Sequence, residues 1–356
     1  MSTQLSDFIN PGLPVELGAI EKSLGQLWEQ TDDTKTRASL INLVIYTEDF
    51  QSAEANTQLI AQLAGEHACR AILVVANPSA KETSAKSWIS AHCQKSGKNQ
   101  RQICSEQITF QLDGNIDEAL PNIVFSHLDS DLPLYFWWQG NFRKSLNTKF
   151  WSWVDRLLFD SRDWENFSEQ IDLARSFAKP ADSLVPNRHT ILCDLNWARL
   201  LQTRFAIAKF FDNGFALSQL NKLKNFRIEY GTGCRSTAIF LLGWFAKQLG
   251  WQLTDLLQKP YFITKNKKDL SFELAEVEGR GIQKLSFLSE EATFTFVYDE
   301  KSHSFHVHVE GKTCPSIEQI LPVGRNNTLD ILLHELNRGG NHPLYTETLE
   351  TIEPLF

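Results

Sequence analysis

Residues 41–47, INLVIYT, and residues 70–77, RAILVVAN, are two nearly unbroken runs of β-branched and aliphatic side chains. Such runs are typical of strands that are buried on both faces of a parallel sheet. Residues 52–67 lie between the two runs and carry apolar side chains at helical spacing, at Ala55, Leu59, Ile60 and Leu63. The order predicts a β-α-β unit with its helix lying over the sheet.

Further elements follow this unit along the chain. We predict a polar helix or loop over 79–96, an alternating strand over 103–112, a helix over 116–127, a strand over 132–138, a short strand over 156–160 and a helix over 164–177. Together these elements predict a doubly wound, Rossmann-like α/β domain over residues 1–180.

The second half of the chain has a different pattern. Residues 179–186, KPADSLVP, contain proline and lack periodicity, so we expect a linker there. Asp194 is the expected N-cap of a helix that reaches residue 211, and a strand over 226–230 precedes a helix over 236–249 that ends at Gly250. These features predict a helix pair.

Beyond residue 270 the chain alternates between apolar and polar side chains. The segments SFELAEV, KLSFLS, ATFTFVY and SFHVHVEG are separated by polar turns, a pattern typical of an antiparallel meander with one covered face. We therefore predict a second, α+β domain over residues 187–356.

Composition argues against several partners. The chain has 35 Lys and Arg against 43 Asp and Glu, a formal net charge of −8, whereas a nucleic-acid binder needs a positive field. Its longest strongly apolar run, residues 238–246, is shorter than the about 20 residues that cross a bilayer. Its first residues lack the basic and apolar regions of a signal peptide. We expect a cytoplasmic protein that binds neither nucleic acid nor membrane.

The six cysteines contain no C-x-x-C pair, and several lie in apolar runs: Cys69, Cys93, Cys104, Cys193, Cys234 and Cys314. We interpret them as reduced thiols that pack as small hydrophobic side chains. Cys93 and Cys104 flank a polar stretch, so a redox pair between them is the alternative.

No complete catalytic or metal motif is present. The chain lacks G-x-S-x-G, and His334-Glu335 is followed by Arg338 where H-E-x-x-H requires a second histidine. His306 and His308 share one face of a predicted strand, but nothing nearby in the sequence supplies further ligands. We predict no catalytic residue, no metal and no cofactor.

Residues 231–237, GTGCRST, lie between a predicted strand and a predicted helix. Backbone N–H groups at a helix start hold anions, and Arg235 and Ser236 stand beside them. The Walker and dinucleotide patterns are both incomplete. Two interpretations remain, a tight turn with a serine N-cap and a site for a phosphate or carboxylate. The second makes a sugar-phosphate enzyme or sensor the alternative function.

Two further groups are candidates for contact with a partner or ligand. Trp137 and Trp138 end the strand LPLYFWWQG; they line a crevice or an interface, or Trp137 packs in the core while Trp138 is exposed. The other group surrounds the helix start after residue 193 and consists of Arg188, Asp194, Arg199 and Arg204, with Trp197 packing inward. The alternative for this group is a helix cap with a solvated face.

Three ordered blocks resemble one known family. They are DLPLYFWWQG over 131–140, DLNWARL over 194–200 followed by Arg204, and AIFLLGWFAKQLG over 238–250. This order is similar to the glucose-6-phosphate dehydrogenase assembly protein family, OpcA. Gln139 stands where the family is expected to carry proline.

The resemblance implies a non-catalytic protein that promotes assembly or the active conformation of glucose-6-phosphate dehydrogenase by direct contact. That enzyme oxidises glucose 6-phosphate with NADP in the oxidative pentose phosphate pathway. An activator of this kind must bind the active form more tightly than the inactive one, because equal affinity shifts no population.

Overall fold

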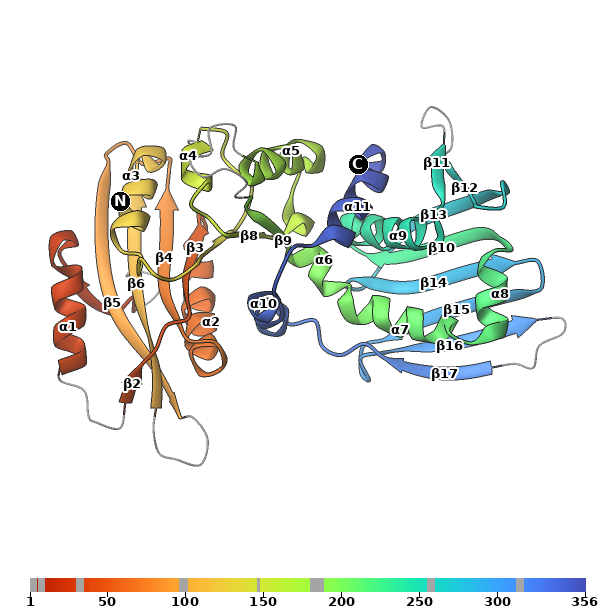
Figure 1. Cartoon of the computed structure of the whole chain (residues 1–356), viewed down its shortest axis with the longest axis horizontal. Helices are drawn as coiled ribbons and strands as arrows, with labels where there is room; N and C mark the ends of the chain where they lie inside the picture. The colour runs from red at the N-terminus through yellow and green to blue at the C-terminus, as the bar shows by residue number, and fades with distance from the viewer. Residues whose placement is uncertain are drawn as a thin grey trace. The chain divides into compact units, whose positions relative to one another are not determined.

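The computed structural model describes residues 5, 10–29, 35–95, 102–145, 148–179, 189–254, 260–311 and 317–356. The chain forms two compact units, each built around one sheet (Figure 1). The first unit comprises Met1–Asp160, Trp164–Cys193 and Thr328–Gly339, and the second comprises Ser161–Asp163, Asp194–Asn327 and Gly340–Phe356. No helix of the described residues is long and apolar enough to cross a bilayer.

The sheet of the first unit has the order β1-β5-β6-β4-β3-β7-β8-β9, and β2 pairs with β6. The strands are β1 (Leu13–Val15), β2 (Lys35–Arg37), β3 (Ile41–Thr47), β4 (Cys69–Asn77), β5 (Ser84–Lys95), β6 (Gln102–Asp113), β7 (Leu134–Trp138), β8 (Arg156–Phe159) and β9 (Ile191–Asp194). Strands β6, β4, β3, β7 and β8 are parallel. The strand order reverses direction at β3, which confirms the doubly wound, Rossmann-like fold.

Helices cover this sheet. They are α1 (Ile20–Glu29), α2 (Ser52–Glu66), α3 (Ile116–Ser126), α4 (Thr148–Trp151), α5 (Phe167–Ala178) and α10 (Thr328–Asn337), with the short η2 (Leu17–Ala19). Helix α2 packs on β3 to β6, and α3 packs on β4 and β6. Every residue of β3 is buried. The apolar runs therefore have their predicted place at the centre of the sheet.

The prediction of a polar helix or loop over 79–96 is wrong, because most of this segment is strand β5. The strand pairs antiparallel with β6 along its whole length. Its buried side chains include Ser87 and Ile89, and the Ser87 hydroxyl donates a hydrogen bond to the Val15 carbonyl at 2.7 Å. A polar residue at a buried position weakens the alternation from which a strand is predicted.

The interpretation of all six cysteines as thiols is wrong for one pair. Cys93 and Cys104 face each other in the β5–β6 ladder and form a disulfide. Pairing of strands places them opposite one another, which their spacing in the sequence does not reveal. Cys69, Cys193 and Cys234 are buried thiols, and burial raises the pKa of Cys69 and Cys193 to about 12. Cys314 lies outside the described residues.

The sheet of the second unit has the order β11-β12-β13-β10-β14-β15-β16-β17. The strands are β10 (Leu223–Gly231), β11 (Gln252–Thr254), β12 (Tyr261–Ile263), β13 (Asp269–Val277), β14 (Ile282–Ser289), β15 (Ala292–Asp299), β16 (Ser304–Gly311) and β17 (Ile317–Pro322). Strands β14 to β17 form the predicted antiparallel meander. Strand β13 does not belong to it, because β10 lies between β13 and β14 and pairs parallel with β13.

Helices pack on one face of this second sheet. They are α6 (Leu195–Arg199), α7 (Leu201–Phe211), α8 (Gly214–Leu220), α9 (Arg235–Leu249) and α11 (Pro343–Ile352), with the short η3 (Ser161–Asp163) and η4 (Glu353–Leu355). The helix predicted from Asp194 to residue 211 is divided at Leu200, whose N–H bonds to the Trp197 carbonyl at 3.1 Å. Phe210 and Phe211 of α7 contact aromatic rings of β15. The helix pair and the sheet thus share one aromatic core.

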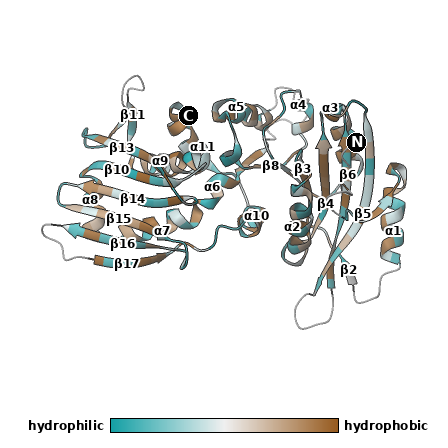
Figure 2. Cartoon of the chain, turned by 180° about the vertical axis from the view of Figure 1, so that it is seen from behind, coloured by the Kyte–Doolittle hydropathy of each residue, from teal (hydrophilic) through white to brown (hydrophobic). Residues whose placement is uncertain are grey.

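The other face of the second sheet carries polar side chains, and Figure 2 shows hydrophilic residues along these strands. Arg227 on β10 forms ion pairs with Glu229 and with Glu273 of the neighbouring strand, both at 3.1 Å. His306 and His308 lie near carboxylates on β15 to β17 and are half exposed. This face therefore has the alternation of an antiparallel sheet that meets water on one side.

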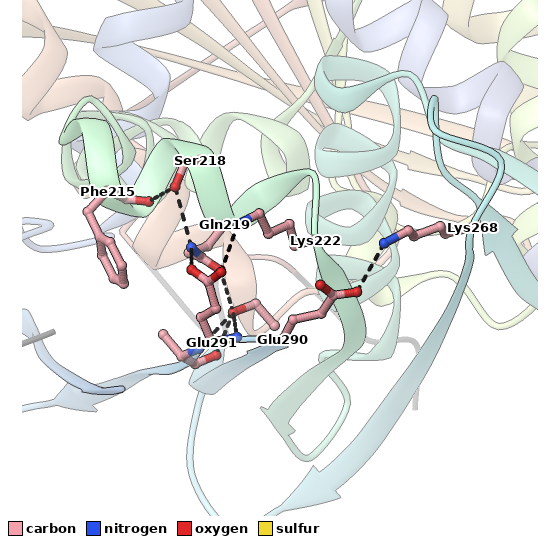
Figure 3. Close-up of polar contacts among 9 residues, drawn as sticks. Phe215, Ser218, Gln219, Lys222, Lys268, Glu290 and Glu291 are labelled. Atoms are coloured by element: carbon pink, nitrogen blue, oxygen red, sulfur yellow. Dashed lines mark hydrogen bonds and ion pairs between the residues drawn. The ribbon is translucent and has the colours of Figure 1, made fainter. Parts of the chain in front are cut away.

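A polar network joins α8 to the turn between β14 and β15 (Figure 3). The Gln219 amide donates to the Glu291 carboxylate at 2.8 Å, and Lys222 pairs with Glu291 at 3.0 Å. Lys222, the larger cause, and Gln219 lower the pKa of Glu291. Ser289, which is buried, donates to the Gln219 side chain at 3.0 Å. The network therefore fixes the hairpin against the helix.

The close packing of α9 and α11 gives a stability prediction for Gly243. A Cβ atom at this position would clash with Ile352 and would lie 2.9 Å from Thr348 Cγ2. Alanine normally stabilises a helix relative to glycine, but here we expect Gly243→Ala to destabilise the second unit by about 1–3 kcal/mol through overpacking. Thermal unfolding measures the change.

The control is Gly25→Ala on α1, where an added Cβ meets nothing within 4 Å. We expect this change to stabilise its helix by about 0.5–1 kcal/mol. Equal effects of the two substitutions would contradict the close α9–α11 contact.

Candidate functional site

The carboxyl ends of β3 and β7 meet where the order of the first sheet reverses, which is where dinucleotides bind in folds of this class. Trp138 at the end of β7 is fully buried and stacks on Tyr46 of β3, with ring centroids 3.9 Å apart. Trp137 is also buried. The alternative that exposes Trp138 is therefore wrong, and neither ring is open to line a crevice or an interface, because both faces of this strand are covered.

The loop that follows β3 is acidic and contains no glycine. Its sequence from residue 47 is TEDFQS. Glu48 accepts a hydrogen bond from the Tyr46 hydroxyl at 2.7 Å and pairs with Arg143 at 3.2 Å. Burial and the nearby Glu48 carboxylate raise the pKa of the Tyr46 phenol. A pyrophosphate needs close approach to the backbone, which glycine allows, and this loop carries carboxylates in place of glycine.

Side chains also close the space between β7 and α2. The Asn56 and Gln139 amides bond reciprocally, with N···O distances of 2.9 and 2.8 Å. Asn56 is buried and lies one turn into α2. Gln139, which stands where the family is expected to carry proline, thus provides one of the two amides of this pair. The arrangement is suited to joining helix and strand and does not form a dinucleotide cradle.

In the second unit, the predicted N-cap Asp194 is the centre of a buried polar network. Its carboxylate accepts hydrogen bonds from the Asn196 N–H at 2.9 Å, the Ser161 hydroxyl at 2.6 Å and the Ser161 N–H at 3.1 Å. The Tyr345 hydroxyl donates to it at 3.3 Å. The side chain is 2% exposed. Asp194 therefore links η3, α6 and α11.

Asn196 extends this network to the start of α9. Its amide donates to the Ser236 hydroxyl at 3.1 Å and accepts from Thr237 at 2.6 Å. Arg235 donates to the Leu355 carbonyl at 3.1 Å. Of the two interpretations of residues 231–237, the serine N-cap is not observed, because Cys234 is the N-cap residue and gives no side-chain cap.

The remaining predicted residues have different surroundings. Arg204 is buried, lies 3.6 Å from the centre of the Trp197 ring and donates to the Trp197 carbonyl at 3.1 Å. Trp197 is buried as predicted. Arg199 is half-buried and lines a cavity. Arg188 lies outside the described residues. The structure thus joins Asp194 and Ser236 through Asn196 and places Arg199 beside the cavity.

This cavity has a volume of about 800 Å³ and is formed entirely by the second unit. Its walls come from η3, the α6–α7 junction, the turn before α9, the β13–β14 turn, the end of β15 with the start of β16, and the segment after β17. Its polar and charged lining includes Arg162, Asp163, Arg199, Thr203, Thr232, Thr237, Arg280, Gln283, Tyr298, Glu300, His303, Arg325, Asn326 and Asn327.

Two glycine turns form part of the cavity wall. The Gly231 N–H donates to the Gly281 carbonyl at 2.8 Å, and a Cβ on Gly231 would clash with the Gly279 carbonyl. Gly233 has φ of +74°, a conformation that side chains rarely adopt. Thr232, Gly233, Cys234 and Thr237 bring the start of α9 to the cavity. The glycines of the GTGCRST segment therefore allow two turns to approach closely.

Sequence reasoning missed most of the charged residues of this cavity. Arg280 lies in the turn EGRG and Arg325 in the segment GRNN. In both cases an arginine beside glycine lies between two elements, which is the one local signal that could have identified them. Their convergence depends on contacts between distant segments.

Both halves of the chain match one protein family, whose two models describe the domains of a glucose-6-phosphate dehydrogenase subunit. The model of the N-terminal domain matches residues 60–176, and the model of the C-terminal domain matches residues 190–349.

Two relatives are each named "Putative OxPP cycle protein OpcA". The one from Synechocystis sp. is 24% identical over 314 residues, covering 82% of this chain and 64% of the relative. The one from Synechococcus elongatus is 26% identical over 287 residues, covering 74% and 62%. The chain spans less than two thirds of the length of both relatives.

Among solved structures, the chain is similar to an aldose-aldose oxidoreductase from Caulobacter crescentus. The two are 9% identical, with a TM-score of 0.48, and the match covers 88% of this chain and 95% of the other.

Proposed function

Because the chain belongs to the glucose-6-phosphate dehydrogenase assembly protein family, OpcA, we propose that it is a non-catalytic assembly factor or allosteric activator of glucose-6-phosphate dehydrogenase. The observation that carries the proposal is the match of both family domains, in order, over residues 60–176 and 190–349. The chain acts by direct contact with the dehydrogenase, in the cytoplasm, within the oxidative pentose phosphate pathway.

The first unit supports a role without catalysis of its own. A dehydrogenase with this strand order needs room for a dinucleotide at the switch point between β3 and β7. Here the loop after β3 carries Glu48 and Asp49, and the Asn56–Gln139 amide pair joins α2 to the end of β7. Carboxylates thus stand in place of the glycines that allow a pyrophosphate to approach the backbone. The unit therefore serves as a scaffold in this proposal.

Activation requires different affinities for two states of the dehydrogenase. If the chain tightens substrate binding by a given factor, then substrate tightens binding of the chain by the same factor. Because of this reciprocity, the proposal can be tested by two measurements, the kinetics of the dehydrogenase and the stability of the complex. The exposed aromatic side chains Trp153 and Phe205, which are 49% and 62% exposed, are suitable probes of the contact because exposed aromatic rings are available to a partner.

The test mixes the purified chain with glucose-6-phosphate dehydrogenase of the same organism. We expect the two proteins to co-elute in size-exclusion chromatography and the dehydrogenase to change its kcat or KM by about fivefold or more. The chain alone should not reduce NADP in the presence of glucose 6-phosphate. Absence of both co-elution and a kinetic change, under reducing as well as oxidising conditions, would reject the proposal.

A further inference from the structure

The cavity of the second unit has a charge opposite to that of the whole chain. Four arginines line it, Arg162, Arg199, Arg280 and Arg325, against two carboxylates, Asp163 and Glu300. With neutral histidine this leaves a net charge of +2 on the walls, whereas the chain as a whole carries −8. A concave surface lined by one sign of charge concentrates ligands of the other sign. The charge of this cavity therefore favours an anionic ligand over a cationic one.

Two of these arginines have no structural ion pair. Among the described residues, neither Arg280 nor Arg325 has a carboxylate within ion-pair distance, and both residues are exposed and line the cavity. Arg162, by contrast, donates to Asp163 at 3.2 Å. Arginine presents a planar set of donors that fits phosphate oxygens. Arg280 and Arg325 are thus available for a phosphate group without loss of an internal contact.

The other polar groups of the cavity indicate which chemical groups the ligand carries besides a phosphate. Glu300, Asn326 and Gln283 offer carboxylate and amide oxygens, which accept hydrogen bonds from hydroxyl groups. The Tyr298 hydroxyl and the His303 ring bond to each other at 3.3 Å on the same wall. A simple inorganic anion would use the arginines and leave these acceptors unused. A ligand with one phosphate and several hydroxyls uses both sets.

We propose that the cavity between η3, the start of α9 and the β13–β14 turn binds a sugar phosphate, with Arg280 and Arg325 at the phosphate and Glu300 at the hydroxyls. The volume of about 800 Å³ falls in the range of small-molecule sites. This site goes beyond the assembly role and does not depend on it, because the ligand binds to the isolated chain.

The test measures binding to the purified full chain, without dehydrogenase, by calorimetry at constant ionic strength. The probes are glucose 6-phosphate, fructose 6-phosphate, glucose and inorganic phosphate. We expect at least one of the two sugar phosphates to bind about tenfold or more tightly than inorganic phosphate, and glucose to bind far more weakly than either.

The variant Arg280→Gln/Arg325→Gln should weaken sugar-phosphate binding by about tenfold or more, because hydrogen bonds to charged groups are lost. The matched control is Lys209→Gln/Lys301→Gln, which removes two exposed positive charges outside the cavity lining. Glu300→Gln should reduce the preference for a sugar phosphate over inorganic phosphate.

Three results would overturn the proposal: no binding of either sugar phosphate, equal affinity for inorganic phosphate and the sugar phosphates, or equal losses in the two double variants. Because the dehydrogenase is absent, none of these results bears on the assembly role. Circular dichroism of each variant shows that it is folded, so a loss of affinity is assigned to the site.

Discussion

Replacing Glu106 by alanine is expected to lower the free energy of unfolding of the first unit by about 3 kcal/mol, because the buried Arg70 keeps only its other partner, Glu21, and the Trp28 indole loses its acceptor. The Glu106 side chain on β6 is fully buried, accepts hydrogen bonds from Arg37 at 2.8 Å and the Trp28 indole at 3.1 Å, and forms an ion pair with Arg70 at 3.1 Å. Arg70 is only 5% exposed. Hydrogen exchange of the β4 and β6 amides measures the loss within this unit, since two units need not unfold together.

The matched control is Glu290→Ala, which removes a carboxylate from an exposed pair. Glu290 pairs with Lys268 at 3.0 Å in the second unit, and this lysine lowers the pKa of Glu290. Water screens such a pair, so we expect little change in stability. If Glu106→Ala were as mild as the control, the buried ion pair would not be an important stabilising contact of the first sheet.

The sequence was most informative where burial alone decides the structure. The runs at Ile41–Thr47 and Cys69–Asn77 are apolar on both faces, and they form the central strands. Strand β5 was missed because its buried face contains Ser87 and its outer face is polar, so the pattern resembles a loop. The parallel pairing of β13 with β10 was missed because the chain order of strands does not fix their neighbours in a sheet.

The candidate residues were harder to predict, because their roles depend on contacts between distant segments. Asp194 was identified from its capping position, but its bonds to Ser161 and Tyr345 come from residues 33 and 151 positions away. Six separate segments form the cavity. Only two of them, the α6–α7 junction and the turn before α9, contain residues that the sequence predicts as site candidates. Arg280 and Arg325 lie in turns without any motif, so their convergence is visible only in the fold.

Asp194→Ala is the other substitution with a large expected effect, a loss of about 3–4 kcal/mol in the stability of the second unit. Removal of the carboxylate leaves the buried Ser161 and Tyr345 donors without this acceptor and removes the cap of α6. Each buried donor that loses its partner costs about 1–3 kcal/mol, and loss of a helix cap costs about 1 kcal/mol. Thermal unfolding followed by near-ultraviolet circular dichroism measures the loss, because Trp197 packs against Tyr345 beside this network.

Tyr345→Phe helps to distinguish a structural role of Asp194 from a role in binding the partner. It removes the hydroxyl that donates to Asp194 at 3.3 Å and keeps the aromatic ring against Trp197, so we expect a loss of about 1 kcal/mol. If Asp194 is structural, stability should fall in the order wild type, Tyr345→Phe, Asp194→Ala, and binding to the dehydrogenase should weaken only as the folded fraction falls. An Asp194→Ala variant that keeps its stability but no longer binds the dehydrogenase would instead make Asp194 a contact residue, which its burial opposes because a side chain 2% exposed offers a partner almost no surface.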